Sequence, residues 1–589
     1  MIILKNAYVL TFNKDNDFGR YSLLINNGKI TDIADSSQTG WAKVEKWVEL
    51  HSSRAEVVDC SDKMIMPPFI NSCVKSEGSL IYYLLRRKHY ENTESDLCTD
   101  LIINYLYQEL QGDDVKKDLA NIYNYSFNRI LKSGVYCFNE FSLRKDINHL
   151  RPINSALKST SQKISISYPI TQDVNTVRDY KHLNPAYYLT QENHITVYDI
   201  SNITELRNHN IRRLFLEVAT NKEVTEKFKL TFRKSIIGVL DEYGLIDEST
   251  SFINPLYTGY DDLKIITDKG ANIIICPRDL NHFSNRYFPI DDFISHGIKF
   301  SIGTGWLGED LLKDVRLFRN KYKELNLSSA ELLLSITKTP YHLFFSRDIS
   351  SDSSYSIEIN KTADLIFIDF SDLRFHFFPE NNEFESVCDF IIDKLTVHKI
   401  SDIIIGGEFK VKANKLVNSD DTKIAEKAIE TRNRLYLIGK YEEIKNRQES
   451  REKTEKLDLR ARNEDEIKLF SEKGEVESPV ESNEEFQIKV KIPTVRQRTV
   501  HTQRSLFEEI EQSQIIQSGE FQNTPLLNLL SADDTASKSV EEDIVQVKNV
   551  DETIIRRLGS EWKTETQKTS DSESKVELPK GVKLKFGDD

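Results

Sequence analysis

The chain has 589 residues, of which 39% are hydrophobic, and its formal net charge at pH 7 is −14. Its length allows more than one folded unit. Its acidic balance, without a basic stripe, argues against nucleic-acid binding, because phosphate contacts need clustered lysine and arginine. Six dispersed cysteines without a CxxC pair indicate neither a zinc ribbon nor a disulfide framework. We find no signal-peptide pattern and no apolar run approaching about 18 residues, so we expect a cytoplasmic protein that does not bind membranes.

The first 60 residues are predicted to form β-strands. Apolar, β-rich runs occupy residues 2–4, 7–12, 21–25, 30–33 and 56–59. The dipeptide Asn27-Gly28 separates two of these runs, and Asn-Gly between apolar runs is the strongest short signal of a β-hairpin.

Between residues 61 and 345, strand-like blocks alternate with helix-like blocks, as a parallel α/β architecture requires. The strand candidates are residues 65–70, 135–138, 163–167, 195–198, 214–218, 251–254, 272–276 and 299–303. Their continuous apolar runs are typical of strands buried on both faces. Helical spacing of apolar residues covers 101–110 and 119–131. Eight strands fit a distorted (β/α)8 barrel.

The remainder of the chain changes character twice. Strand-like runs return at residues 361–369 and 403–411, and residues 421–462 are charged and helical in propensity. Residues 463–589 are mostly polar and are predicted to be largely disordered, because they cannot bury enough apolar surface to offset chain ordering. Two apolar islands, 505–510 and 524–530, are either transient helices or amphipathic docking segments for a partner.

The stretch MIMPPFINSCVKSE, residues 64–77, resembles the first barrel strand of the amidohydrolase superfamily, in particular its chlorohydrolase and cytosine-deaminase-like branch. Shorter matches follow in the expected order at residues 131–135, 276–278, 289–298 and 361–365, so that the resemblance covers about residues 1–440. It implies a TIM-barrel domain over 61–349. It also implies a small composite β-sandwich made of residues 1–60 and 350–420.

In that family, the first strand ends in two metal-binding histidines, and three later strands supply the remaining ligands and the catalytic acid. At the matching positions this chain carries Cys73, Lys75, Glu217, Thr220, Asn254 and Gly305. A protonated lysine has no lone pair to offer a metal, and glycine has no side chain. The family's zinc or iron site is therefore predicted to be lost, with no cofactor and no confident catalytic residue.

Two of these positions have opposite charge. Because a vacated polar cavity is costly unless its charges are paired, we expect Lys75 and Glu217 to form an ion pair where the metal would lie. The alternative is that both side chains point to solvent or to other partners. We expect Trp306 to fill part of the pocket and His282 to lie at the barrel mouth. Cys73 is either a nucleophile or a small buried residue that fills the former ligand position.

Three functions remain open. The first is a catalytically inactive pseudoenzyme used for binding or assembly. The second is a hydrolase with altered catalytic residues, acting on a C–N (non-peptide) or C–Cl bond of a small molecule. The third is an interaction protein whose tail binds partners while the barrel serves as a scaffold. A small-molecule ligand, a homodimer, or pairing with an active relative would each be compatible with the family.

Overall fold

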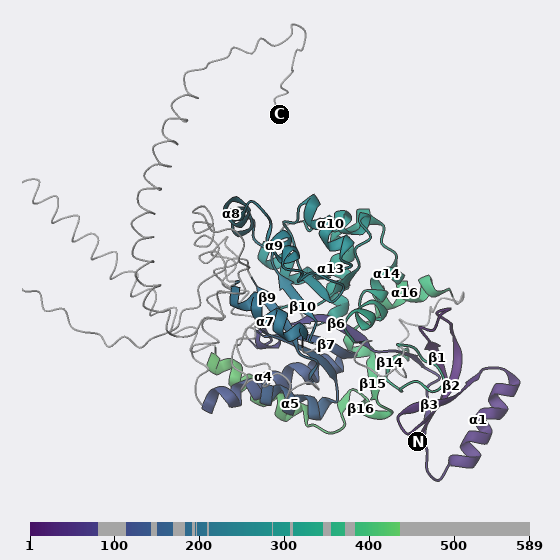
Figure 1. Ribbon diagram of the computed structural model, residues 1–589. Helices are drawn as coiled ribbons and strands as arrows, with labels where there is room; N and C mark the ends of the chain where they lie inside the picture. Colours follow the sequence, from purple (N-terminus) through teal and green to yellow (C-terminus); the bar gives the residue numbers. More distant parts are fainter. Residues whose placement is uncertain are drawn as a thin grey trace, which may run out of the picture. The chain divides into compact units, whose positions relative to one another are not determined.

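The computed structural model (Figure 1) describes the chain from Met1 to residue 435 with gaps. The described residues are 1–80, 113–142, 150–168, 183–190, 195, 197–208, 211–284, 287–306, 310–345, 355–371 and 383–435. The predicted tail, with its islands at 505–510 and 524–530, lies outside these residues, as do residues 436–462. No helix in the described ranges is long and apolar enough to cross a membrane.

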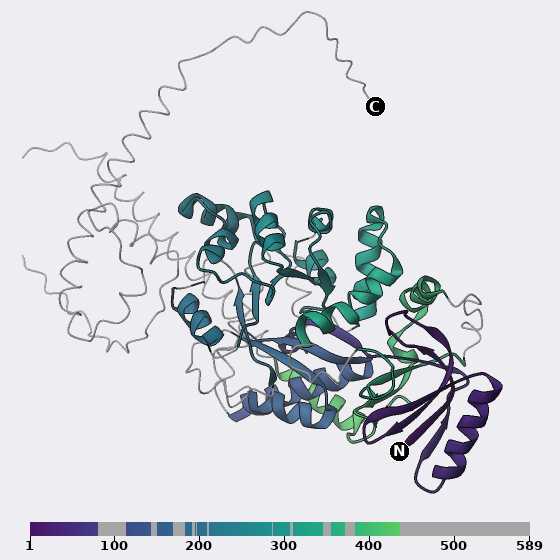
Figure 2. The ribbon, with the colours of Figure 1, turned by 45° about the vertical axis from the view of Figure 1, so that its right-hand side comes forward.

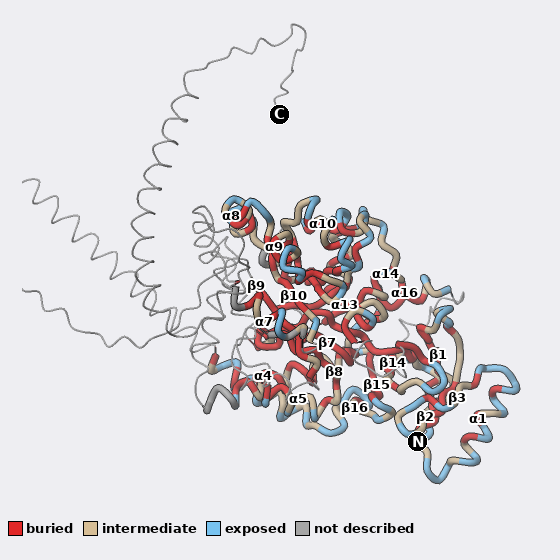
Figure 3. The backbone as a smooth tube through the Cα atoms, in the orientation of Figure 1, coloured by how far each residue is buried: buried red, intermediate tan, exposed pale blue. Residues whose placement is uncertain are grey.

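Eight parallel strands form a nearly closed barrel, which confirms the predicted TIM-barrel fold. They are β6 (Phe69–Val74), β7 (Val135–Phe141), β8 (Lys163–Tyr168), β9 (Ala186–Thr190), β10 (Leu214–Glu217), β11 (Thr250–Ile253), β12 (Asn272–Ile275) and β13 (Phe300–Ile302), paired in chain order. A bridge between Val74 and Gly305 joins the last strand to the first. The carbonyl of Cys73 accepts hydrogen bonds from the amides of Thr304 and Gly305, both at 2.9 Å. Continuous apolar runs place these strands in the buried centre of the barrel (Figure 3).

The fourth barrel strand differs from the prediction. β9 covers Ala186–Thr190 and pairs with β8 and β10, whereas Val197 and Tyr198 of the strand predicted at 195–198 begin helix α7 (Val197–Asn208). Both segments are short and rich in β-forming residues, and periodicity cannot separate a short strand from the start of a helix. The pairing partners decide the outcome, because only β9 has neighbours on both sides.

Helices surround the barrel (Figure 2). The longer ones are α4 (Asp113–Lys132), α5 (Leu150–Thr160), α7, α8 (Lys222–Phe232), α9 (Ile236–Glu242), α10 (Tyr260–Asp268), α12 (Ile290–Ser295), α13 (Leu311–Lys321) and α14 (Ser329–Leu334). The helix predicted at 119–131 lies within α4, while the one predicted at 101–110 lies outside the described residues. Short turns η1 (Ser76–Gly78), α11 (Pro277–Asp279) and η5 (Leu280–Ser284) follow strands β6 and β12 at the barrel mouth.

The segments before and after the barrel meet in a second sheet. Its strands are β1 (Ile2–Leu10), β2 (Phe18–Asn26), β3 (Lys29–Asp35), β4 (Glu56–Asp59), β5 (Lys63–Met66), β14 (Leu365–Asp369), β15 (Ile400–Ile405), β16 (Glu408–Lys412) and β17 (Lys415–Leu416). β5 pairs with β14 antiparallel, with Ile65 opposite Phe367. The strands of the composite unit that the resemblance implied are thus hydrogen-bonded into one continuous sheet of nine strands.

The hairpin predicted at Asn27-Gly28 is present. Both residues have positive φ, 50° and 79°, and the turn connects β2 to β3 with Asn26 opposite Lys29. Sequence analysis did not identify helix α1 (Gln38–His51), which packs on this sheet through Val44 and Trp47. Its signal was the N-cap: the Ser37 hydroxyl accepts from the amide of Gly40 at 3.1 Å.

A helix over residues 421–435 follows the second sheet and packs on α4. The Thr431 hydroxyl donates to the Asp118 carboxylate at 3.0 Å, and the Asn121 amide donates to Thr431 at 3.1 Å. Lys132 pairs with Asp421 at 2.6 Å. One further helix, α16 (Phe384–Lys394), packs against α14.

Candidate functional site

Lys75 and Glu217 face each other at the C-terminal ends of barrel strands, where α/β barrels place their reactive groups. Lys75 follows β6 and Glu217 ends β10. The Lys75 Nζ lies 2.8 Å from one carboxylate oxygen of Glu217 and 2.9 Å from the other. The predicted ion pair is therefore present, and it is bidentate on the carboxylate side.

The surroundings of the pair favour a charged lysine. The Lys75 side chain is 3% exposed and that of Glu217 is 21% exposed. Burial opposes the charge of Lys75, but the negative charges of Glu217 and Asp279 outweigh it and raise the pKa of the lysine above its ordinary value. The Tyr188 hydroxyl, on β9, donates to the Glu217 carboxylate. Lys75 Nζ also lies 5.1 Å from the ring centre of Trp306.

Trp306 packs against the turn η1 beside Lys75. Its ring packs so closely on η1 that a Cβ atom at Gly78 would approach it to 2.7 Å. The side chain is largely buried. It therefore occupies space beside Lys75 rather than lining open solvent.

Asp279 occupies the space that a side chain at position 305 would need. A Cβ atom at Gly305 would lie 1.9 Å from the Asp279 Oδ2. The backbone of Gly305 has a φ of +61°, which favours glycine. The same carboxylate oxygen accepts a hydrogen bond from the amide of Trp306 at 2.8 Å. A carboxylate from α11, the turn that follows the seventh strand, thus stands next to Gly305, which follows the eighth strand.

Cys73 lies beside a second thiol, that of Cys276 at the end of β12. Hydrogen bonding between the two thiols and burial raise the pKa of Cys276 well above its ordinary value. Both cysteines are buried and free. The backbone of Gly303 packs directly on Cys73, because an added Cβ would approach the Cys73 amide nitrogen to 2.5 Å. These contacts agree with Cys73 as a small buried residue that fills its position.

The other predicted positions are used in different ways. Asn254 has a φ of 48°, and its side-chain oxygen accepts from the amide of Cys276 at 2.8 Å, so it holds the end of β12 in place. Thr220 is half-buried in the loop after β10. His282 lies in the turn η5 beyond β12 and is half-buried.

Sequence analysis missed a network of buried carboxylates next to Lys75. The amide and hydroxyl of Ser76 donate to Glu140 at 3.0 and 2.7 Å. Tyr123 and Ser142 donate to Glu77 at 2.8 and 3.0 Å. Burial raises the pKa of Glu140 well above its ordinary value, and the nearby Glu77 adds to the effect. The available signal was a glutamate within the apolar run of β7, which is costly to bury without partners.

The chemistry of this donor set does not fit a divalent metal. The ammonium of Lys75 points at the carboxylate of Glu217, and an ammonium repels a cation and has no lone pair. Position 305 has no donor, and Asp279 accepts from a backbone amide. Among the described residues, no group of three or more His, Cys, Asp or Glu side chains could hold a metal ion.

Several curated proteins align with the chain at low identity. A 5'-deoxyadenosine deaminase from Methanopyrus kandleri is 21% identical over 224 residues, which are 37% of this chain and 50% of that protein. A 5-methylthioadenosine/S-adenosylhomocysteine deaminase from Acetivibrio thermocellus is 21% identical over 458 residues, 72% of this chain and 96% of that protein. In the first of these matches, the chain spans about half the length of its relative. No model of a known protein family matches the chain.

Solved structures agree on the fold. An adenosine deaminase from Xanthomonas campestris with bound zinc has a TM-score of 0.59 at 14% identity, covering 74% of this chain and 98% of that one. The chain thus shares the fold of this zinc-bound deaminase. The atrazine chlorohydrolase from Arthrobacter aurescens complexed with zinc, with a TM-score of 0.59 at 14% identity, covers 73% of this chain and 100% of that one. Both of these solved structures hold zinc.

Proposed function

We propose that this amidohydrolase-fold protein is a binding or assembly protein whose barrel mouth does not carry out metal-dependent hydrolysis. The observation that supports the proposal is the bidentate pair of Lys75 with Glu217. In a metal-dependent hydrolase, these strand ends would present neutral or anionic ligands and leave an open position for water. Here the positive charge is supplied by the protein itself.

The role of Lys75 follows from its environment. Its pKa is raised, so the amine stays protonated at neutral pH and cannot act as a nucleophile or base. Glu217 and Tyr188 hold it in place. The charge therefore balances a buried carboxylate and shapes a polar wall at the mouth. A small-molecule ligand, a homodimer and pairing with an active relative remain proposals for what the protein binds.

A second candidate is a hydrolase with altered chemistry. The curated relatives are deaminases by name, and Glu217 is exposed enough, at 21%, to reach a ligand in the mouth. In this reading, Glu217 would act as a general base for a water molecule that attacks a C–N or C–Cl bond of an adenosine-like or triazine-like compound.

Metal content and turnover separate the two candidates. We would grow the full chain in zinc-supplemented medium, measure bound zinc and iron, and assay 5'-deoxyadenosine, S-adenosylhomocysteine and atrazine. The proposal predicts metal well below one ion per chain and no turnover. Stoichiometric metal with chelator-sensitive turnover would overturn it. Metal-free turnover abolished by Glu217→Gln, but not by Glu226→Gln on the exposed face of α8, would establish the second candidate.

A further inference from the structure

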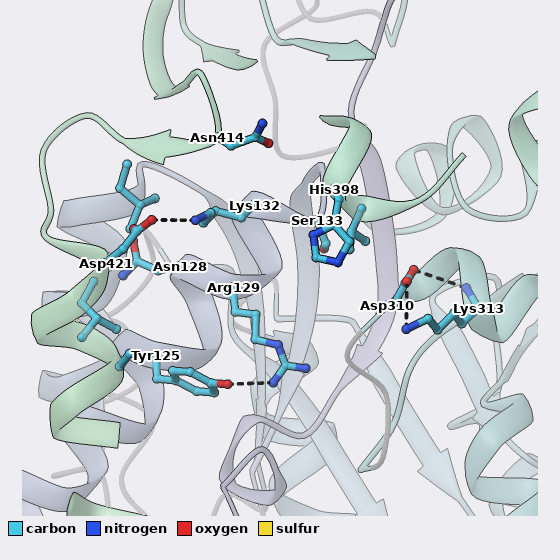
Figure 4. A pocket seen from close by; sticks show the side chains of 14 residues that line it. Tyr125, Asn128, Arg129, Lys132, Ser133, Asp310, Lys313, His398, Asn414 and Asp421 are labelled. Atoms are coloured by element: carbon cyan, nitrogen blue, oxygen red, sulfur yellow. Dashed lines mark hydrogen bonds and ion pairs between the residues drawn. The ribbon is translucent and has the colours of Figure 1, made fainter. Parts of the chain in front are cut away.

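A second cavity, with a volume of about 750 Å³, lies outside the barrel strands. It is enclosed by the second half of α4, the start of α13, residues 397–398, the turn from β16 to β17, and the helix 421–435 (Figure 4). Small-molecule sites in proteins usually have volumes of roughly 300–1,000 Å³. The cavity therefore has the size of a ligand site, and its walls come from segments that lie far apart in the sequence.

The charged lining of this cavity is more basic than acidic. Arg129, Lys132 and Lys313 face two carboxylates, Asp310 and Asp421, which leaves one net positive charge. This excess contrasts with the net charge of −14 for the whole chain. A local positive excess on an acidic protein favours an anionic ligand over a cationic one.

Both carboxylates have structural partners. Asp421 pairs with Lys132 at 2.6 Å and begins the helix 421–435. Asp310 is the N-cap of α13, accepting from the amide of Lys313 at 3.3 Å, and its other oxygen lies 3.7 Å from the Lys313 ammonium. Both carboxylates are thus engaged in contacts within the walls of the cavity. The side chains of Arg129, Lys132 and Lys313 line the space between these walls.

Arg129 occupies the centre of this arrangement. Figure 4 shows its guanidinium between the Lys132–Asp421 pair on one side and the Lys313–Asp310 pair on the other, with the His398 ring above. One guanidinium nitrogen donates to the Tyr125 hydroxyl at 3.2 Å. Burial lowers the pKa of Arg129, and nearby Arg278 lowers it further. A bound anion would offset both effects, and the planar fork of arginine suits phosphate and carboxylate oxygens.

The rest of the lining combines polar side chains, those of Asn128, Ser133, His398 and Asn414, with apolar ones. Val397, Leu416, Ile424 and Ala425 contribute aliphatic surface, and Tyr125 adds an aromatic ring. A lining that combines apolar walls with a few convergent polar groups is typical of sites for organic molecules rather than for bare inorganic ions.

We propose that this cavity binds a small organic anion, with its phosphate or carboxylate group at Arg129 and its apolar body against the helix 421–435. Because α4 and that helix form one side of the cavity and the start of α13 forms the other, the bound ligand would bridge these three segments. The site is separate from the barrel mouth. Arg129 also lines a cavity of about 20 Å³ shared with Lys75 and Trp306, so it stands between the two sites.

Titration calorimetry on the full chain tests this inference, with phenyl phosphate and benzoate as anionic probes and benzyl alcohol as the neutral analogue. We expect at least one anion to bind about tenfold more tightly than benzyl alcohol, and its affinity to fall as salt rises. Arg129→Met, which keeps an unbranched apolar side chain but removes the guanidinium, should weaken that binding by at least about tenfold. Lys117→Met, on the exposed side of the same helix, is the matched control and should change it less than about twofold.

A second variant protects the test against misfolding. Lys313 is 67% exposed, so Lys313→Met should fold normally and weaken anion binding about threefold or more. Anion binding no tighter than that of benzyl alcohol would overturn the inference. If Arg129→Met folds, unchanged anion affinity in both variants would also overturn the inference. If Arg129→Met does not melt cooperatively, unchanged anion affinity in Lys313→Met alone would overturn it.

Discussion

Replacing Lys75 by methionine is the sharpest test of how the barrel mouth is held together. Methionine has nearly the volume of lysine but carries no charge, so the substitution removes the ammonium and leaves the Glu217 carboxylate in place. That carboxylate would keep the hydroxyl of Tyr188 as a donor. It would lose both hydrogen bonds from Lys75, at 2.8 and 2.9 Å.

The size of the effect follows from burial. Removing one partner of a buried ion pair costs about 3–5 kcal/mol, because the other charge is left uncompensated. Glu217 is 21% exposed and keeps one donor, so water relieves part of this cost. We therefore expect Lys75→Met to lower the free energy of unfolding by about 2–3 kcal/mol. Removing both charges, with Lys75→Met and Glu217→Gln together, should cost only about 1 kcal/mol.

Urea unfolding at pH 7 measures these values, and urea is preferred to guanidinium because it does not screen charges. Lys43→Met is the control: Lys43 pairs with Asp32 at 2.5 Å, but its side chain is 43% exposed. A surface pair of this kind should contribute less than about 1 kcal/mol. If Lys75→Met were as stable as the parent, or if the double variant were as unstable as the single one, the pair would not stabilise the barrel mouth as we argue.

Two further substitutions probe neighbouring features by the same unfolding assay. Gly305→Ala should cost about 2–4 kcal/mol, because it strains a positive φ and meets the Asp279 carboxylate at 1.9 Å. Gly297→Ala, with a φ of +71° and no atom within 4 Å of the added Cβ, should cost only about 1 kcal/mol; equal costs would contradict the steric argument. Glu140 has a raised pKa in the folded chain, so its contribution to stability is present below its ordinary pKa of 4.5 and is lost as pH rises. The free energy of unfolding of Glu140→Gln, measured relative to that of the parent, should therefore rise by about 1–3 kcal/mol between pH 4.5 and pH 8. A difference in stability between the two proteins that does not change with pH would refute this assignment.

Much of the fold could be predicted because its signals are local. Six of the eight barrel strands coincide with apolar runs that the sequence displays in the correct order. The run predicted at 65–70 divides instead between β5 of the second sheet and β6 of the barrel, because Pro67 and Pro68 separate the two strands. The fourth strand, β9, shows another limit of this reasoning. Ala186–Thr190 and residues 195–198 look alike as short β-rich runs, and only the pairing of β9 with β8 and β10 selects the strand. Helix α1 was missed although its Ser37 cap is visible in the sequence.

The candidate site was likewise predicted only in part from the sequence. Motif order located Lys75 and Glu217, and their opposite charge predicted their pairing, which the 2.8 Å contact confirms. Motif order did not predict that Tyr188 would donate to Glu217 or that Asp279 would stand beside Gly305. Neither residue belongs to a matched position, and each reaches the site only through the curvature of the barrel.

By itself, the sequence determined the architecture and the substituted ligand positions, because strand periodicity and residue chemistry are written along the chain. Only the tertiary structure showed which groups meet at the barrel mouth: the ammonium of Lys75 with the carboxylate of Glu217, the carboxylate of Asp279 beside Gly305, and the thiol of Cys73 with that of Cys276. It also brought α4 and the helix 421–435 together around a basic cavity. The physical reason is that closing a barrel joins residues more than 200 positions apart, and no local pattern records which side chains will then meet.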